Sequence, residues 1–166
     1  MLFCDEAGFC LHPKLGRVWA KKGKQPYVLT KSQHYKRLNV AGWVDPINGK
    51  HGIIQNEKGN TDGFINTLRT ILYRFKETII DIWVDNACWH KGKKVNAFLV
   101  QHKELIINYL PKYHPELNKQ EMLWRFMRYE ETTNTYYESF EELRIAVFKR
   151  SQKWKTNKIL SLCHFN

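Results

Sequence analysis

No apolar run in this 166-residue sequence approaches the roughly 20 residues that a membrane-spanning helix needs. The opening stretch MLFCDEAGF turns acidic at its fifth residue and does not resemble a secretory signal peptide. Internal repeats, low-complexity tracts and linker-like segments are also absent from the sequence. We therefore expect a soluble, intracellular protein with no membrane partner, in which residues 1–166 form a single domain.

The sequence contains no CxxC pair, although it has four cysteines, Cys4, Cys10, Cys88 and Cys163. Cys4, Cys10 and His12 are close together, but a zinc site would need a fourth ligand from a distant part of the chain. This spacing disfavours structural zinc, and free thiols in a reducing compartment are the better interpretation.

Acidic residues are comparatively few. The chain has 16 Asp and Glu against 27 Lys and Arg, which gives a formal net charge of +11. An excess of this size is typical of proteins that bind a polyanion, and nucleic acid is the leading candidate. The alternative is a basic protein without such a partner. The basic residues gather at Lys21, Lys22 and Lys24, at Lys91, Lys93 and Lys94, and along 149–158.

The hydrophobic pattern predicts a mixed α/β domain. Residues 1–11 alternate as a strand, residues 21–30 look like a loop running into a strand, and 35–44 with 51–55 form a hairpin around the turn 45–50. From Thr61 the period becomes helical to about Glu77. Strands ending at Asp85 and near Leu110 then alternate with helices at 93–104, after Asn118 and at 139–154. The first strand should lie centrally, beside the strand that ends at Asp85.

Three acidic positions attract attention because of where they fall in these elements. In an extended first strand, Phe3, Asp5 and Ala7 share one face, so Asp5 and Glu6 cannot both serve one site. Asp85 follows a strand at its carboxyl end, where sites gather in α/β sheets. Its alternative role is a turn together with Asn86, and His90 nearby is typical of a hydrogen-bonded structural residue.

The stretch LPKYHPELNKQEMLW, residues 110–124, places Glu121 in the first turn of a helix. Asn118 and Glu121 match a capping-box spacing, and Glu121 with Arg125 is a favourable i,i+4 pair. On the predicted helix, Glu121, Arg125 and Arg128 lie opposite an apolar face. That face is formed by Met122, Leu123, Phe126 and Met127. Capping and metal binding therefore both remain open for Glu121.

A carboxylate in the first strand, one after a later strand and one opening a helix can converge at a single sheet edge. Three hard oxygen donors suit Mg²⁺ or Mn²⁺, which keep water molecules for a substrate. Such a cluster is what two-metal phosphodiester chemistry requires, with ions roughly 3.5–4 Å apart.

The blocks FCDEAGF, VDNACWH and LPKYHPELNKQEMLW, in this order, resemble the signature blocks of the mariner-like DDE transposase superfamily, especially its bacterial insertion-sequence branch. RVWAKKGKQPYV also resembles the block that follows the first Asp. The resemblance implies a ribonuclease-H-like mixed sheet flanked by helices, and metal-dependent DNA strand cleavage and transfer at transposon ends. It assigns catalysis and metal binding to Asp5, Asp85 and Glu121, with 35 residues between the last two. Residues expected to approach DNA are Asn86, His90, Lys91, Lys93, Lys94, Trp124, Arg125 and Arg128.

The resemblance also implies DNA partners, a dimer assembled on DNA and a cytoplasmic, nucleoid-associated location. The sequence departs from the family at Lys119 and Gln120, which replace Pro-Ile, and at His114, which replaces Ser. The family's N-terminal helix-turn-helix region has no counterpart, so a separate DNA-binding chain is a further expectation. Alternative interpretations are another nuclease of the same fold, such as an RNase H or a junction resolvase, and a non-catalytic DNA-binding relic.

Overall fold

A mixed five-stranded sheet forms the centre of the protein, whose computed structural model describes residues 1–30, 37–76 and 78–163. The strand order is β3-β2-β1-β4-β5, so the first strand is central and lies beside the strand that precedes Asp85, as predicted. β1, β2 and β3 are antiparallel, whereas β1, β4 and β5 are parallel. The strands span Leu2–Cys10 (β1), Arg37–Asp45 (β2), Lys50–Asn56 (β3), Ile80–Val84 (β4) and Leu105–Tyr109 (β5).

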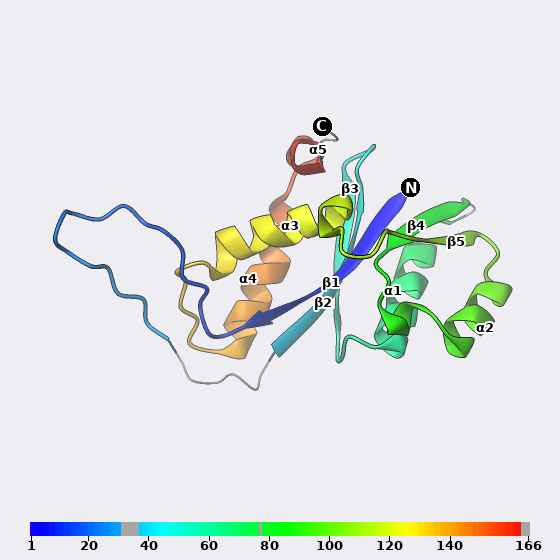
Figure 1. Cartoon of the computed structure of the whole chain (residues 1–166), viewed down its shortest axis with the longest axis horizontal. Coiled ribbons are helices and arrows are strands. Elements are labelled where there is room, and N and C mark those ends of the chain that lie inside the picture. Colours follow the sequence, from blue (N-terminus) through cyan, green and yellow to red (C-terminus); the bar gives the residue numbers. More distant parts are fainter. Residues whose placement is uncertain (31–36, 77, 164–166) are drawn as a thin grey trace.

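Helices cover both faces of this sheet, with α1 and α2 on one side and α3, α4 and α5 on the other (Figure 1). They span Thr61–Arg74 (α1), Lys93–Gln101 (α2), Lys119–Met127 (α3), Phe140–Lys153 (α4) and Thr156–Cys163 (α5). Short helical turns occur at Cys88–His90 (η1), Pro115–Leu117 (η2) and Arg128–Thr132 (η3). The sequence pattern did not predict α5. None of the helices in the described ranges combines the length and apolar character that a membrane crossing requires.

The sheet separates two apolar cores, because side chains alternate between its faces. On β1, Phe3, Ala7 and Phe9 pack with the helices α3, α4 and α5. Leu2 and Cys4 of the same strand pack on the opposite face, with α1, β4 and β5. β1 is therefore fixed from both sides, which holds any functional side chain that it carries.

The predicted hairpin and its turn are confirmed by β2 and β3. Asp45 is buried, and its carboxylate accepts hydrogen bonds from the amides of Ile47 and Asn48 at 3.0 and 3.2 Å. Gly49 has φ 65°, a left-handed conformation that favours glycine. These bonds close the turn and fix the register of the two strands.

A long arm leaves the end of β1 and projects from the body of the molecule (Figure 1). Residues 21–30 of this arm contain no strand, so the strand predicted there is wrong. The arm exposes large apolar side chains, including Leu15, Trp19 and Tyr27. Its base is tied down by the amide of Lys14, which donates to the carbonyl of Thr132 at 3.0 Å. The arm thus presents apolar surface without a core of its own.

The sheet topology places Asp5 and Asp85 at the same edge. β1 pairs with β4 only through Leu2 and Phe3, so β1 continues past the end of β4. The two strands are parallel, and Asp85 directly follows the last residue of β4. Asp5 therefore lies beside the carboxyl end of β4, where parallel strands bring functional side chains together.

The buried face of α3 differs from the predicted one. Met122 and Phe126 are only partly buried, whereas Gln120 and Trp124 are fully buried together with Leu123 and Met127. Both amide atoms of the Gln120 side chain are buried and make no hydrogen bond within the described residues. A buried amide without partners costs about 1–3 kcal/mol. Gln120 therefore destabilises this core.

We expect Gln120→Met to raise the free energy of unfolding by about 1–2 kcal/mol, because an apolar side chain of similar length removes two unpartnered polar atoms. Urea unfolding measures the change. Gln101→Met, at an exposed position of α2, is the matched control and should stay within about 0.5 kcal/mol of the parent. Equal stability of Gln120→Met and the parent would show that the Gln120 amide finds partners in solution.

Candidate active site

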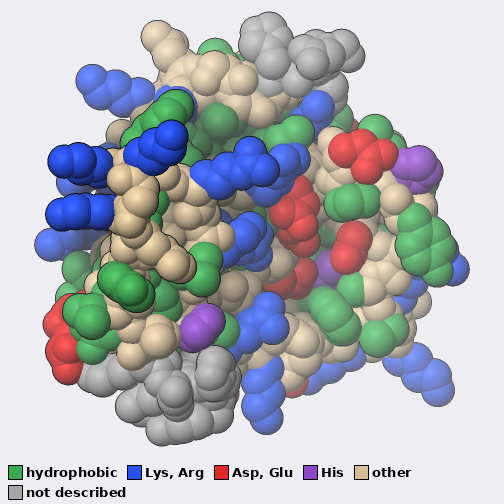
Figure 2. Space-filling view, turned by 60° about the vertical axis from the view of Figure 1, so that its left-hand side comes forward, with side chains coloured by type: hydrophobic (Ala, Val, Ile, Leu, Met, Phe, Trp, Pro, Cys, Tyr) green, Lys and Arg blue, Asp and Glu red, His purple; other side chains and the backbone are tan. Residues whose placement is uncertain are grey.

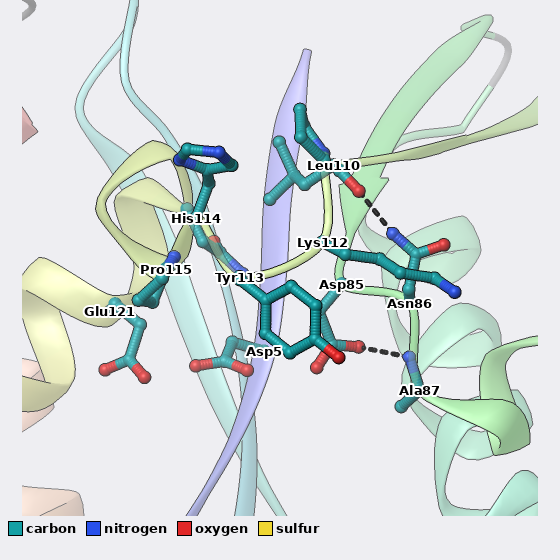
Figure 3. A pocket seen from close by; sticks show the side chains of 12 residues that line it. Asp5, Asp85, Asn86, Ala87, Leu110, Lys112, Tyr113, His114, Pro115 and Glu121 are labelled. Atoms are coloured by element: carbon teal, nitrogen blue, oxygen red, sulfur yellow. Dashed lines mark hydrogen bonds between the residues drawn. The ribbon is translucent and has the colours of Figure 1, made fainter.

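A cavity of about 380 Å³ lies between the middle of β1, the end of β4 and the start of α3 (Figure 3). All three predicted carboxylates line it, and each comes from a different element. Figure 3 shows the Asp5 side chain between those of Glu121 and Asp85. The full lining is Asp5, Asp85, Asn86, Ala87, Leu110, Pro111, Lys112, Tyr113, His114, Pro115, Asn118 and Glu121.

Asp5 is the most constrained of the three acids. Its Oδ2 atom is buried and makes no hydrogen bond within the described ranges. Burial, followed by the negative charges of Glu121, Glu6 and Asp85, raises the pKa of Asp5 from 3.8 to about 8. This carboxylate oxygen has no partner and lies near two other acids. A cation placed among them would relieve the repulsion between the negative charges. Asp5 therefore has the electrostatics of a metal ligand.

Asp85 is held by two donors on one oxygen. Its Oδ1 accepts a hydrogen bond from the amide of Ala87 at 3.0 Å and lies 2.8 Å from Nδ1 of His90. The hydrogen bond from His90 is the largest of the influences that lower the pKa of Asp85. The hydrogen bond from Ala87 is typical of a turn, which is the alternative role predicted for Asp85 from the sequence. Both contacts use Oδ1, which leaves Oδ2 available to a ligand.

His90 lies between two acids. Its side chain is 1% exposed, with Nε2 3.0 Å from Glu6 Oε1 and Nδ1 facing Asp85. Burial alone would lower the pKa of His90, but the bonds to Asp85 and Glu6 outweigh it and raise the pKa to about 9. The ring also packs against Phe64, with centroids 4.3 Å apart. His90 is therefore a buried imidazolium that orients Asp85.

This arrangement corrects the prediction that His90 approaches DNA, since it has almost no exposed surface. It also gives Glu6 a role that the sequence analysis missed. Glu6 does not line this cavity, as the alternation predicted, although Asp5 and Glu6 both line a neighbouring one. It acts on the site through His90, across 84 positions of sequence.

Glu121 opens α3, and Asn118 caps this helix. The Asn118 side chain accepts from the amide of Gln120 at 3.1 Å and donates to the carbonyl of Cys4 at 3.0 Å. The predicted capping box is incomplete, because the Asn118 amide donates to Pro115 instead of Glu121. The Glu121 carboxylate makes no hydrogen bond or ion pair with any residue in the described ranges, Arg125 included. It is free to bind a ligand.

In the described part of the chain, no group of three or more His, Cys, Asp and Glu side chains forms a metal-holding cluster. Three carboxylates in one cavity repel one another when no cation is among them, which favours their separation. The side chains nevertheless fit a hard divalent cation by chemistry, since an unpartnered Asp5 oxygen, a free Asp85 oxygen and the Glu121 carboxylate line one space. A cation would require these side chains to move closer together.

A model of the DDE superfamily endonuclease family matches residues 1–144. The chain belongs to this family. It is 30% identical over 141 residues to the insertion element IS630 uncharacterized 39 kDa protein of Shigella sonnei, which covers 84% of this chain. The chain spans only 40% of that relative.

Solved structures with the same fold include the Mos1 transposase paired-end complex with left transposon end, at a TM-score of 0.72 and 16% identity. Another is the Mos1 mariner paired end complex with Mn, at a TM-score of 0.72 and 15% identity. Each similarity covers 98% of this chain and 51% of the Mos1 chain. The DDE family member described here therefore has the predicted ribonuclease-H-like fold.

The predicted DNA contacts of this chain are divided between the cavity and the surface around it. Asn86 lines the cavity, and its Oδ1 accepts a hydrogen bond from Nζ of Lys91 at 2.6 Å. Lys91 also lies 4.3 Å from the ring centroid of Tyr109. Lys94 instead pairs with Asp62, away from the lining. Lys93, in the first turn of α2, is exposed.

On α3, the predicted contacts differ in exposure. Arg125 is exposed and lines a neighbouring hollow of about 260 Å³ together with Glu121. The Arg128 guanidinium lies 5.7 Å from the ring centroid of Phe9. Trp124 has no exposed surface and packs edge-to-face on Phe9, so the prediction that it lines the approach to DNA is wrong. Helical spacing alone did not reveal that Trp124 lies on the face of α3 that packs against the sheet.

The lead-in to α3 contributes residues that the sequence analysis did not assign to the site. Lys112, Tyr113 and His114 line the cavity between the two prolines of this segment. Tyr113 is exposed and has φ 63°, an uncommon conformation for a residue other than glycine. The flanking Pro111 and Pro115 were the signal that could have identified this rigid wall.

We expect Glu6→Gln to lower the pKa of His90 by about one unit, because one of its two acidic partners loses its charge. The raised pKa stabilises the fold fully below about 6.5, and this stabilisation is lost as the pH rises through 9. The parent should therefore lose more stability than Glu6→Gln between pH 7 and 10. NMR titration of the His90 ring gives the pKa, and an unchanged value would remove Glu6 from this network.

Asp5→Asn should remove a pH-dependent destabilisation. The pKa of Asp5 is raised on folding, so the folded state binds the extra proton between about pH 4 and 8 and loses stability as the pH rises through this range. Without divalent metal, the variant should melt a few degrees higher than the parent at pH 8 and similarly near pH 4. Asp81→Asn, exposed on β4, is the control. Parallel melting curves of Asp5→Asn and the parent would show that Asp5 titrates normally.

Proposed function

We propose that this chain is the catalytic domain of a transposase that cleaves DNA strands and transfers them at transposon ends, using Mg²⁺ or Mn²⁺. The single observation that carries the proposal is the convergence of Asp5, Asp85 and Glu121 on one cavity from three separate elements. Family membership and the Mos1 fold support the same conclusion. Residues 1–166 act as one domain in this proposal.

Asp5, Asp85 and Glu121 would hold the metal ions. Bound there, the ions supply an activated water or 3′-hydroxyl and stabilise the leaving oxygen. The carboxyl group of Asp5, whose pKa is raised to about 8, would lose its proton on holding a cation, so that binding and deprotonation would be coupled. Support for Mn²⁺ comes from the Mos1 complex with that metal, and support for Mg²⁺ from the carboxylate donor set.

The residues around the metal site would orient the substrate. Asn86 and Lys91 form a linked pair at one wall, and Lys112 places a cation on the cavity lining. His90 and Glu6 keep Oδ1 of Asp85 engaged, so that only Oδ2 is presented to the cation. Tyr113 and the two prolines form a stiff wall that limits how far the strand can shift.

DNA is the partner in this proposal. The net charge of +11 favours a polyanion, and Lys and Arg side chains border a group of acidic side chains on the face shown in Figure 2. We also propose a dimer on DNA. Support comes from the arm, which exposes an apolar surface formed by Leu15, Trp19 and Tyr27 that a second copy could cover. A separate DNA-binding chain or region would recognise the transposon ends, consistent with a chain that spans 40% of the Shigella sonnei relative and 51% of the Mos1 chain.

Glu121→Gln separates catalysis from helix capping. The amide keeps the shape of the carboxylate but is a poor ligand for a hard cation, so metal-dependent nicking should fall at least about 100-fold. Stability without metal should change by less than about 1 kcal/mol, because Asn118 supplies the cap. Plasmid nicking and thermal melts with and without Mn²⁺ measure both effects.

Asp81→Asn removes an exposed carboxylate from β4 and is the matched control, expected to nick like the parent. Mn²⁺ should raise the melting temperature of the control and parent equally, and that of Glu121→Gln by less. A Glu121→Gln protein that nicks DNA like the parent would contradict the three-carboxylate site. A parent without any metal-dependent nicking would instead favour the non-catalytic relic.

A further inference from the structure

A second cavity, of about 260 Å³, adjoins the acidic site. It shares Asp5 and Asp85 with the first cavity, but its other walls come from different elements. The first is bounded by Glu121 and the segment before α3, whereas the second is bounded by Arg37, Lys58 and Trp89. We call this second space the Arg37 cavity. The two carboxylates thus stand at the junction of two spaces.

The course of β1 creates this second space. Beyond Phe3, the edge of β1 that faces away from β2 has no strand partner in the described part of the sheet, because β4 ends at Val84. Asp5, Glu6 and Ala7 of this open edge line the Arg37 cavity.

Arg37 reaches the cavity because Gly8 lies beneath it. Arg37 starts β2 opposite Cys10, and its guanidinium occupies the space that a Cβ at Gly8 would fill. Neither Arg37 nor Lys58 makes a hydrogen bond or ion pair with any residue of ranges 1–30, 37–76 and 78–163. Both side chains are exposed, and two cations that pair with none of the described residues beside one small cavity favour an anionic ligand.

The remaining walls are compatible with such an anion. Glu6 also lines the cavity, but its Oε1 atom already contacts Nε2 of His90 at 3.0 Å. The indole Nε1 of Trp89 is buried and has no hydrogen-bond partner among the described residues. Trp89 lines the same cavity as Arg37 and Lys58, so its unpartnered N–H is a further candidate donor for an oxyanion.

The ligand is more consistent with part of a polymer than with a free ion. Asp5 and Asp85, at the shared wall, repel an isolated anion, whereas a strand already held in the first cavity is present at high effective concentration. A volume near 260 Å³ is also below the roughly 300–1,000 Å³ of typical small-molecule pockets. The space suits a phosphate with part of its sugar.

We propose that the Arg37 cavity binds a backbone phosphate of the nucleic-acid strand, next to the phosphate that lies at Asp5, Asp85 and Glu121. This inference rests on the proposed function and extends it by giving the path of the strand. The strand runs from the segment before α3 across the two aspartates to Arg37 and Lys58. Arg37 contacts the phosphate in a bidentate manner, Lys58 contributes a point charge, and the Trp89 indole donates a hydrogen bond.

The test follows the Trp89 indole N–H by NMR, assigned with Trp89→Phe, during titration of the full chain with oligothymidylate of about ten nucleotides and Mg²⁺. In the parent, this resonance should shift on binding. In Arg37→Ala/Lys58→Ala the shift should be lost, and the slope of log Kd against log salt concentration should fall by about 1. Gly8→Ala keeps the net charge but displaces the guanidinium, and it should also reduce the shift.

Arg69→Ala/Lys103→Ala removes the same charge from exposed positions outside the cavity and should behave like the parent. An equal shift in the Arg37→Ala/Lys58→Ala protein, or no shift in the parent, would overturn the inference. An equal shift with inorganic phosphate at matched concentration would overturn the strand as the ligand. Plasmid nicking by the carboxylate variants tests the proposed function separately, since the NMR readout does not require cleavage.

Discussion

The repulsion among carboxylates around Asp5 is the constraint on which the rest of the structure depends. A buried acid near Glu121, Glu6 and Asp85 opposes folding whenever it is ionised and no cation is present. The protein accommodates it by placing Asp5 on the central strand, where Phe3 and Ala7 anchor one face and Cys4 the other. The apolar cores on both sides of β1 offset the cost of the charge.

Each of the other two acids is positioned by a bond to a distant part of the chain. Asn118 caps α3 and also donates to the carbonyl of Cys4, so the helix that carries Glu121 is tied to the strand that carries Asp5. Asp85 is fixed through His90, whose second nitrogen contacts Glu6 on the same strand as Asp5. Contacts to β1 therefore position all three carboxylates, although β1 itself pairs with β4 through only a short stretch.

Much of this fold follows from local sequence patterns. Alternation in residues 1–11 predicted which face of β1 carries Asp5, and the change of period at Thr61 marked the start of α1. The mixed sheet and the place of its first strand were also predicted. The turn around Asp45 could be read directly, because Asp, Pro, Asn and Gly signal a turn through their own backbone preferences.

What the sequence could not reveal depends on contacts between distant segments. Trp124 and Gln120 face the sheet because β2 has a glycine, Gly42, opposite them, and helical spacing cannot show that. Glu6 reaches Asp85 only through His90, and Arg37 crosses β1 only because position 8 is glycine. In each case the partner is far away in sequence, and periodicity describes one element at a time.

The charge distribution joins these observations. A chain with a net charge of +11 concentrates acids at one sheet edge, and Arg37 and Lys58 beside them pair with no residue in the part of the chain that the structure describes. Neither a purely anionic nor a purely cationic ligand satisfies both groups. The proposed metal-bound phosphodiester would satisfy both, with its cations at Asp5 and Asp85 and its neighbouring phosphate at the guanidinium. In this proposal a cation would arrive together with the substrate and neutralise the buried Oδ2 of Asp5, which has no hydrogen-bond partner among the described residues.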